Sequence, residues 1–220
     1  MPTPSDLSPA SLRADARRVF TQGPFLLKTL QHLRPAICPF GPLLELIPPN
    51  ASVLDVGCGG GLLLALIASH RSPRRLTGFD SSKEAIALAT ANLKNFPNTE
   101  PQFHRLDVGQ PWPTGPFDVI TLCDVLHHVP KEAQAALLRD CASALAPGGR
   151  FIYKDVYPEG LFRPNVSRLH DLVIAQQIIH IPRFNQVRTT LENAGLSLIH
   201  HARHNTLAYG HELAAFHKNP

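Results

Sequence analysis

The hydrophobic and polar positions of the chain alternate between two periods from Ala51 onward. Short apolar runs typical of buried strands are followed by segments whose apolar residues recur every three or four positions, as on one face of a helix. This order predicts an α/β fold in which a largely parallel sheet carries helices on both faces. The runs expected to form its first five strands lie at 52–57, 75–80, 102–108, 117–124 and 150–156.

The segments between and after these strands carry local signals for helix ends. Ser81 stands three residues before Glu84, the spacing of a capping box, so a helix is expected to begin immediately after Asp80. Pro130 is expected to open the helix after the fourth strand, and residues 147–149, "PGG", to stop it. Further helices are predicted at 61–70, 165–180 and 184–195, and strand-like runs at 196–204 and 210–218 favour a closing antiparallel hairpin.

The first 49 residues follow a different pattern. They contain nine of the 21 prolines, which predicts short helical pieces at 23–33 and 39–47. We therefore expect an N-terminal helical cap over residues 1–49 and a main domain over residues 50–220.

Composition excludes several classes of protein. A hydrophobic content of 44% with 17% charged residues is ordinary for a globular chain. No apolar run approaches the roughly 20 residues that cross a bilayer, and the N-terminus lacks the apolar core of a secretory signal, so no membrane segment and a cytoplasmic location are expected. The net charge of +4 comes from scattered basic residues, which argues against a nucleic-acid groove.

The cysteines and clustered histidines do not indicate a metal site. The four cysteines are widely spaced and contain no CxxC pair, so reduced thiols are expected in place of disulfides or zinc. His200, His201 and His204 share one predicted strand, but no third ligand accompanies two of them on one side, so no metal is expected.

The stretch "VLDVGCGGG" at 53–61 indicates a ligand site. A strand that must turn sharply into a helix through bare glycines leaves no Cβ to keep a ligand from the backbone. Asp80 ends the second strand, where a carboxylate can accept hydrogen bonds from both hydroxyls of a ribose. A dinucleotide fold would require a glycine at position 62, which is leucine, and Asp55 would repel a pyrophosphate. The pattern therefore favours a cationic, adenosine-type ligand.

These motifs together resemble the class I S-adenosylmethionine-dependent methyltransferases. "VLDVGCGGG" looks like their first motif, "LTGFDSS" their second strand with its acidic ribose ligand, and "FHRLDV" their adenine-contacting segment. "FDVITLCDVLHHVP" resembles their fourth strand with its following loop, and "LAPGGRFIYKD" their fifth strand. The resemblance implies a Rossmann-like, doubly wound sheet of seven strands in the order 3-2-1-4-5-7-6, the last one antiparallel, and S-adenosyl-L-methionine as cofactor.

The resemblance also assigns roles to residues of the cofactor site. The backbone of Gly57, Cys58 and Gly59 would line the methionine half, within a set that also includes Gly61 and Ser81. Asp55 would orient the cofactor's ammonium group and the Cys123 carbonyl would accept from it. Asp80 would hold the ribose, and Asp107 with Val108 would border the adenine.

Histidines supply the candidates for a catalytic base, because their unperturbed pKa is nearest to neutrality. His127 and His128 lie in the loop after the fourth strand, although "LHHVP" is also a common structural form of that loop. His170 lies on a helical insertion at about 157–183, where the family usually builds its substrate pocket, although a polar row on a helix is usually a solvated face.

The apolar insertion and the N-terminal cap favour an enclosed pocket for a small lipophilic or aromatic substrate. The loop sequence "CDVLHH" lacks the Asn/Asp-Pro-Pro-Tyr type of motif found in amino methyltransferases of nucleic acid bases. We therefore expect O-methylation of a small molecule, with C-methylation of an activated ring as the alternative. A non-catalytic relative and an NAD-type oxidoreductase are the other classes considered. Segments such as "RLHDLVIAQQIIH" faintly resemble bacterial methyltransferases of polyketide or aryl pigment pathways, and the oligomeric state stays open.

Overall fold

The computed structural model describes residues 6–94, 96, 100–107, 109–157, 180–205 and 210–219. The chain divides into two compact units, Met1–Pro113 and Thr114–Pro220, which we name the N-terminal unit and the C-terminal unit. Apart from His180, the predicted helix at 165–180 lies outside the described residues, as does almost all of the predicted insertion at 157–183.

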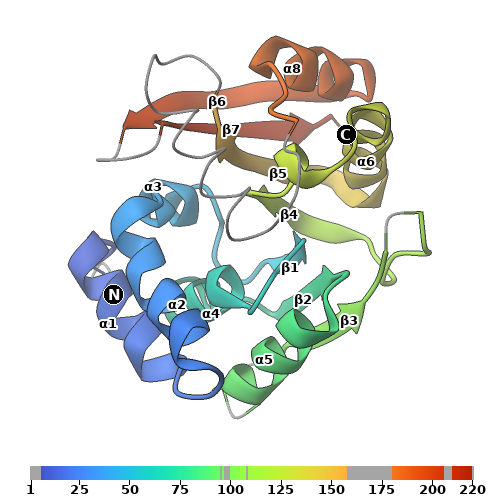
Figure 1. The fold of residues 1–220 in the computed structure, drawn as a ribbon. Helices are drawn as coiled ribbons and strands as arrows, with labels where there is room; N and C mark the ends of the chain where they lie inside the picture. Colours follow the sequence, from blue (N-terminus) through green and yellow to red (C-terminus); the bar gives the residue numbers. More distant parts are fainter. Residues whose placement is uncertain are drawn as a thin grey trace. The chain divides into compact units, whose positions relative to one another are not determined.

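The strands form one seven-stranded sheet in the order β3-β2-β1-β4-β5-β7-β6, which confirms the predicted topology (Figure 1). β1 pairs in parallel with β2, β2 with β3, and β4 with β5, whereas β7 runs antiparallel to both β5 and β6. The strands are β1 Ser52–Val56, β2 Arg75–Asp80, β3 Gln102–Arg105, β4 Phe117–Cys123, β5 Leu145–Val156, β6 Leu196–Asn205 and β7 Gly210–Lys218.

The described residues of the N-terminal unit form β1 to β3 and five helices. The helix after β1, α4, buries six consecutive residues from Leu62 to Ile67, as expected of a helix that is apolar on all sides. Its helices are α1 Pro9–Val19, α2 Phe25–Ile37, α3 Phe40–Glu45, α4 Leu62–Arg71 and α5 Lys83–Leu93.

The first two helices differ from the prediction. The sequence analysis missed α1, although Ser8 caps it by accepting from the Ser11 amide at 3.3 Å and Pro9 opens it. The prediction that proline ends the second helix near residue 33 was wrong. α2 continues through Pro35 to Ile37, and Pro35 is the residue of α2 that is buried, so packing offsets the hydrogen bond that proline cannot make.

The start of α5 is one residue later than predicted. The helix cap is Ser82 and not Ser81, since the Ser82 hydroxyl accepts from the Ala85 amide at 3.1 Å. The cause is the side chain of Asp80, whose Oδ1 accepts from the Ser82 amide at 2.9 Å and so forms a turn before the helix begins. The predicted box of Ser81 with Glu84 was therefore wrong.

The C-terminal unit holds β4 to β7, helices α6 Lys131–Ala144 and α8 Phe184–Asn193, and the short 3₁₀ helix η1 Leu126–His128. α6 ends at Ala144, and residues 147–149 lie within β5 instead of stopping the helix. The β4–β5 register shifts between Phe117 and Val119, where the extra residues of β5 are accommodated. β7 is buried over its first seven residues, as expected of a strand paired on both sides.

No helix within the described residues is both long enough and apolar enough to span a bilayer.

Candidate functional site

The glycine turn between β1 and α4 uses backbone angles that favour glycine. Gly57, Gly59 and Gly61 have φ values of 69°, 52° and 83°. The amides of Gly57 and Cys58 both donate to the Phe79 carbonyl, at 2.9 and 3.0 Å, and the Gly61 amide donates to the Cys58 carbonyl at 2.9 Å. The turn is therefore held to the end of β2 by main-chain hydrogen bonds.

The glycines of this region differ in what surrounds them. A Cβ at Gly61 would lie 3.1 Å from Ala89, and one at Gly78 on β2 would lie 2.7 Å from Leu64 and 2.9 Å from the Cys58 sulfur. A Cβ at Gly59 would meet nothing within 4 Å. Gly61 and Gly78 are therefore required by packing, whereas Gly59 borders open space that a ligand can approach.

Asp80 joins the glycine turn to the start of α5. Its Oδ2 accepts from the Gly59 amide at 2.9 Å, and its Oδ1 accepts from the Ser82 amide. The side chain is half-buried, so each carboxylate oxygen retains capacity to accept from a ligand hydroxyl. The structure thus brings together Gly59 and Asp80, two residues that the sequence analysis placed in one site.

Two acids surround the thiol of Cys58. Burial raises the pKa of Cys58 well above its ordinary value, and the negative charges of Asp55 and Asp80 raise it further. Asp55 is only 2% exposed and lies opposite Gly78 in the β1–β2 register. The turn is therefore a place of concentrated negative charge, which suits a cationic ligand.

The other predicted cofactor residues of the N-terminal unit lie near its surface. Ser81 is exposed, and its carbonyl accepts from the Arg105 side chain at 3.2 Å. Asp107 is exposed, and its amide donates to the Gln110 side chain at 2.9 Å. Val108 lies outside the described residues.

One residue beside the glycine turn was missed. A Cβ at Gly60 would lie 2.9 Å from Nε2 of Gln31, so this α2 side chain lies against the turn. Its Oε1 is buried and has no hydrogen-bond partner among the described residues. α2 also carries Lys28, Thr29, His32 and Arg34, so no local signal distinguished Gln31.

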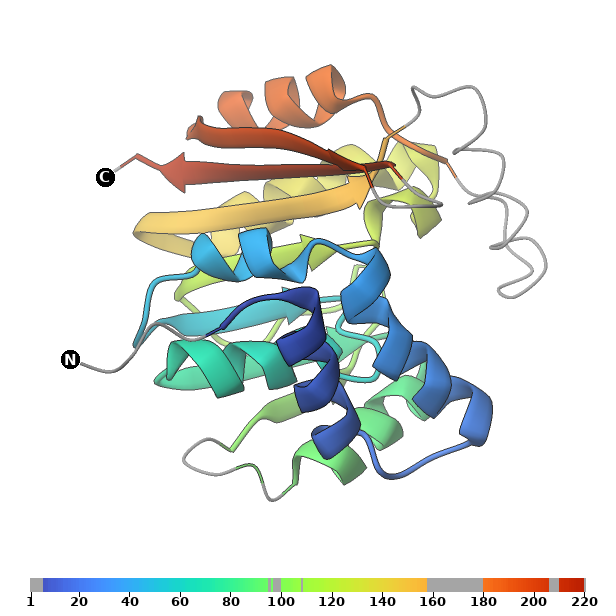
Figure 2. The same cartoon turned by 90° about the vertical axis from the view of Figure 1, so that its left-hand side faces the viewer.

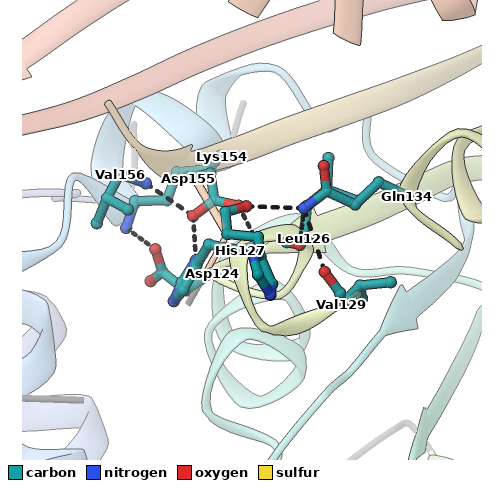
Figure 3. A network of polar contacts seen from close by, with 9 residues as sticks. Asp124, Leu126, His127, Val129, Gln134, Lys154, Asp155 and Val156 are labelled. Carbon is teal, nitrogen blue, oxygen red and sulfur yellow. Dashed lines mark hydrogen bonds and ion pairs between the residues drawn. The ribbon is translucent and has the colours of Figure 1, made fainter. Parts of the chain in front are cut away.

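The loop after β4, residues 124–130, is held by two consecutive side chains of β5 (Figure 3). Asp124 directly follows β4 with a φ of 58°, and its amide donates to the Lys154 carbonyl at 2.8 Å. The Lys154 ammonium, on a residue 1% exposed, donates to Oδ1 of Asp124 at 2.5 Å. We call this segment the post-β4 loop.

The next residue of β5, Asp155, is fully buried and binds His127. Its Oδ1 contacts Nδ1 of His127 and accepts from the Val156 amide at 2.8 Å, while its Oδ2 accepts from the His127 amide at 3.2 Å. An ionised carboxylate only accepts hydrogen bonds, so Nδ1 of His127 carries a hydrogen, and in the neutral imidazole Nε2 then carries the lone pair.

Gln134 of α6 fixes the far side of the same loop. Its Nε2 lies 3.0 and 3.2 Å from the carbonyl oxygens of Leu126 and Val129 (Figure 3) and 2.7 Å from that of His180, so its two hydrogens are shared among three acceptors. The His180 amide in turn donates to the His127 carbonyl at 2.7 Å. The loop is therefore bound from β5 on one side and from α6 on the other.

The two candidate histidines of this loop occupy different environments. His127 is 3% exposed, whereas His128 is exposed, and the centroids of their rings lie 4.0 Å apart. Cys123, at the end of β4, is half-buried. His170 lies outside the described residues.

Lys154, Asp155 and Gln134 were not predicted from the sequence as members of this site. The signal was the adjacent pair "KD" inside the apolar strand "RFIYKDV", because charged residues in a buried strand need partners. Tyr153, the residue before them, is also buried, and burial raises its pKa well above the ordinary value, with Asp155, Glu212 and Asp124 adding to the effect. It remains a neutral phenol.

The fold and the glycine turn agree with the comparison to protein families. Residues 29–201 match the family described as Methyltransferase domain. That range covers more than half of the chain and includes the turn, Asp80 and the post-β4 loop. The chain therefore belongs to the class I S-adenosylmethionine-dependent methyltransferase family, whose cofactor is S-adenosylmethionine.

The chain is similar to two ubiquinone biosynthesis O-methyltransferases. It is 33% identical over 143 residues to that of Albidiferax ferrireducens, over 63% of this chain and 49% of the relative. It is 35% identical over 99 residues to the mitochondrial one of Saccharomyces cerevisiae, over 45% of this chain and 31% of the relative. The chain thus spans less than half the length of these relatives.

Its fold is similar to that of magnesium protoporphyrin IX methyltransferase from Synechocystis PCC 6803 with bound SAH. The TM-score is 0.67 at 20% identity, over 94% of each chain. The pyocyanin biosynthetic protein PhzM has a TM-score of 0.67 at 19% identity, over 88% of this chain and 57% of that one. These likenesses support the shared fold.

Proposed function

We propose that the protein transfers a methyl group from S-adenosylmethionine to a hydroxyl oxygen of a small, lipophilic or aromatic molecule. Family membership supports the reaction class, and the similarity to ubiquinone biosynthesis O-methyltransferases supports an oxygen acceptor. C-methylation of an activated ring remains the second candidate acceptor chemistry.

The observation that carries this proposal is the meeting of Gly59 and Asp80. The bare Cα of Gly59 borders open space, and its amide is held by the carboxylate that ends β2. In this proposal Asp80 accepts from the ribose hydroxyls, the backbone of Gly57, Cys58 and Gly59 lines the methionine part, and Asp55 attracts the ammonium. When bound, S-adenosylmethionine supplies a methyl group made electrophilic by its sulfonium.

In the same proposal His127 is the general base for the acceptor hydroxyl. Asp155 fixes its Nδ1–H, so Nε2 is available to take the hydroxyl proton, and the carboxylate stabilises the resulting imidazolium. Asp155 is therefore a positioning residue. His128, which is exposed, serves as the comparison residue.

The first experiment measures binding and transfer separately. Isothermal titration of the purified chain with S-adenosylhomocysteine is expected to give saturable binding that Asp80→Ala weakens by roughly tenfold or more, because charge-assisted hydrogen bonds are lost. Transfer of a labelled methyl group to a panel of phenols then tests the acceptor. Saturable binding with product labelled on ring carbon would favour C-methylation, and no binding at all would overturn the proposal.

The second experiment tests the base with the same labelled assay. His127→Gln is expected to lower kcat by about 10²- to 10⁴-fold while S-adenosylhomocysteine affinity is retained. Asp155→Asn should also lower kcat and displace the acidic limb of the pH–rate profile to lower pH, because the carboxylate no longer stabilises the imidazolium. Equal losses in His127→Gln and His128→Gln, or an unmoved pH profile, would contradict the assignment.

A further inference from the structure

The beginning of α2 exposes large apolar side chains to solvent. Phe25 is 82% exposed, Leu26 65% and Leu27 41%. Leu33 and Ile37 of the same helix are 43% and 37% exposed, and in the described part of the chain Ile199 is the other exposed large hydrophobic residue. The exposed apolar surface is thus concentrated on one helix, which marks an interaction site more often than isolated residues do.

These exposed side chains of α2 lie in a part of the N-terminal unit that is held by hydrogen bonds. α1 and α2 lie side by side and are joined by a short connection at one end (Figure 2). The Gln22 amide in that connection donates to the Asn92 side chain of α5 at 3.0 Å, and the Phe20 carbonyl lies 3.0 Å from Nε2 of His32. We name residues 17–28, "RRVFTQGPFLLK", the α1–α2 tip.

The three most N-terminal of these side chains point in different directions from α2. Consecutive helical residues point about 100° apart, so Phe25, Leu26 and Leu27 spread over more than half of the helix circumference. A helix that packs by one stripe cannot bury all three. The apolar surface at the α1–α2 tip therefore suits a broad surface better than a narrow groove.

The α1–α2 tip is also basic. Its charged residues are Arg17, Arg18 and Lys28, and it contains no acid. Arg17 and Arg18 lie in the last turn of α1, and the Arg18 side chain is 71% exposed although it pairs with Asp15 at 2.9 Å. Lys94, exposed just after α5, adds a fourth cation two residues beyond Asn92.

We propose that the α1–α2 tip binds the surface of an anionic lipid bilayer, with Phe25, Leu26 and Leu27 inserted at the boundary of headgroups and acyl chains. Apolar side chains with flanking cations are the two signals that together hold a protein at such a surface. A second copy of the chain is a less suitable occupant because two basic tips repel each other. The inference goes beyond methyl transfer and does not depend on it.

The test is co-sedimentation of the full chain with vesicles. Binding to vesicles of phosphatidylcholine with 30–40% phosphatidylglycerol, as a rough working composition, is expected to exceed binding to pure phosphatidylcholine and to weaken with salt. Phe25→Glu with Leu26→Glu should lower the partition coefficient by at least about tenfold, since two apolar groups are lost from the interface.

Ile199→Glu provides the matched control, because Ile199 is 50% exposed and lies in the C-terminal unit. It should leave vesicle binding unchanged, and all variants should keep the affinity for S-adenosylhomocysteine of the parent chain, which shows that they are folded. Absence of binding to the anionic vesicles, or equal loss in Ile199→Glu, would overturn the proposal. A dimer in solution that the double variant converts to monomer, without vesicle binding, would assign the surface to a second copy instead.

Discussion

The glycine turn and the post-β4 loop occupy corresponding places after two strands, yet they are held by different forces. The turn is held by main-chain hydrogen bonds to Phe79 and by glycines whose Cβ atoms would collide with neighbours. The post-β4 loop is held by buried charged side chains, Lys154 and Asp155, which come from the neighbouring strand. The glycine turn thus depends on residues without a side chain, whereas the post-β4 loop depends on charged side chains with suitable partners.

The two regions are therefore expected to respond differently to substitution. In the turn, adding one carbon either collides with packed atoms or fills space where a ligand approaches. In the post-β4 loop, removing Asp124 takes a carboxylate away from the buried Lys154, and an uncompensated buried charge is more costly than a misplaced methyl group. The strongest effects on stability are therefore expected in the C-terminal unit.

Removing the carboxylate of Asp124 should have the largest effect. Asp124→Ala leaves the buried Lys154 ammonium without this carboxylate and places alanine at a φ of 58°, so the free energy of unfolding should fall by about 3–5 kcal/mol. Urea denaturation measures this. The double variant Asp124→Asn with Lys154→Met removes both charges and should lose much less. If the double variant were as unstable as Asp124→Ala, charge matching would not be the cause.

Two alanine substitutions divide the glycines by function. Gly78→Ala should lower the free energy of unfolding by about 1–3 kcal/mol, because its Cβ would lie 2.7 Å from Leu64. Gly59→Ala meets nothing in the protein, and its strained φ should cost about 1–2 kcal/mol, but affinity for S-adenosylhomocysteine should fall by at least about tenfold. Urea denaturation measures the stabilities and titration calorimetry the affinities; unchanged affinity in Gly59→Ala would show that Gly59 does not face the ligand.

The smallest effect concerns the start of α5. Ser82→Ala removes the cap of the Ala85 amide and should lower the free energy of unfolding by about 1 kcal/mol. Ser81→Ala is the matched control and should change stability within about 0.5 kcal/mol, because Ser81 is exposed and does not cap the helix. If thermal denaturation showed equal losses of stability for Ser82→Ala and Ser81→Ala, the capping box predicted from the sequence would be supported instead.

The sequence predicts the turn because its signals are local, whereas the strand order was predicted from the resemblance to the methyltransferase family. Glycines between two apolar runs, and an acid at the end of the next run, require only neighbouring residues to be interpreted. The position of Ser82 as cap was not predicted, because it depends on a turn in which the Asp80 side chain accepts from the Ser82 amide. The passage of α2 through Pro35 depends on packing that the local pattern does not contain.

The contacts that hold the post-β4 loop could not be predicted from residues close together in the sequence. Asp124 and Lys154 are 30 positions apart, and His127 and Asp155 are 28 apart. Their pairing depends on the register of β4 against β5, which includes an irregularity between Phe117 and Val119. The sequence analysis therefore identified His127 without Asp155, and it could not distinguish His127 from His128, which differ in burial.

Lys154 and Asp155 are adjacent on β5 but have different partners, so together they favour one register of β5 against β4. If β5 moved by one residue in one direction, Asp155 would face Asp124, and two negative charges would oppose each other. If it moved the other way, Lys154 would replace Asp155 beside His127, and the imidazole would lose its acceptor. Shifted registers of β5 are therefore electrostatically unfavourable. Two neighbouring ionic side chains thus specify the register that the strand adopts.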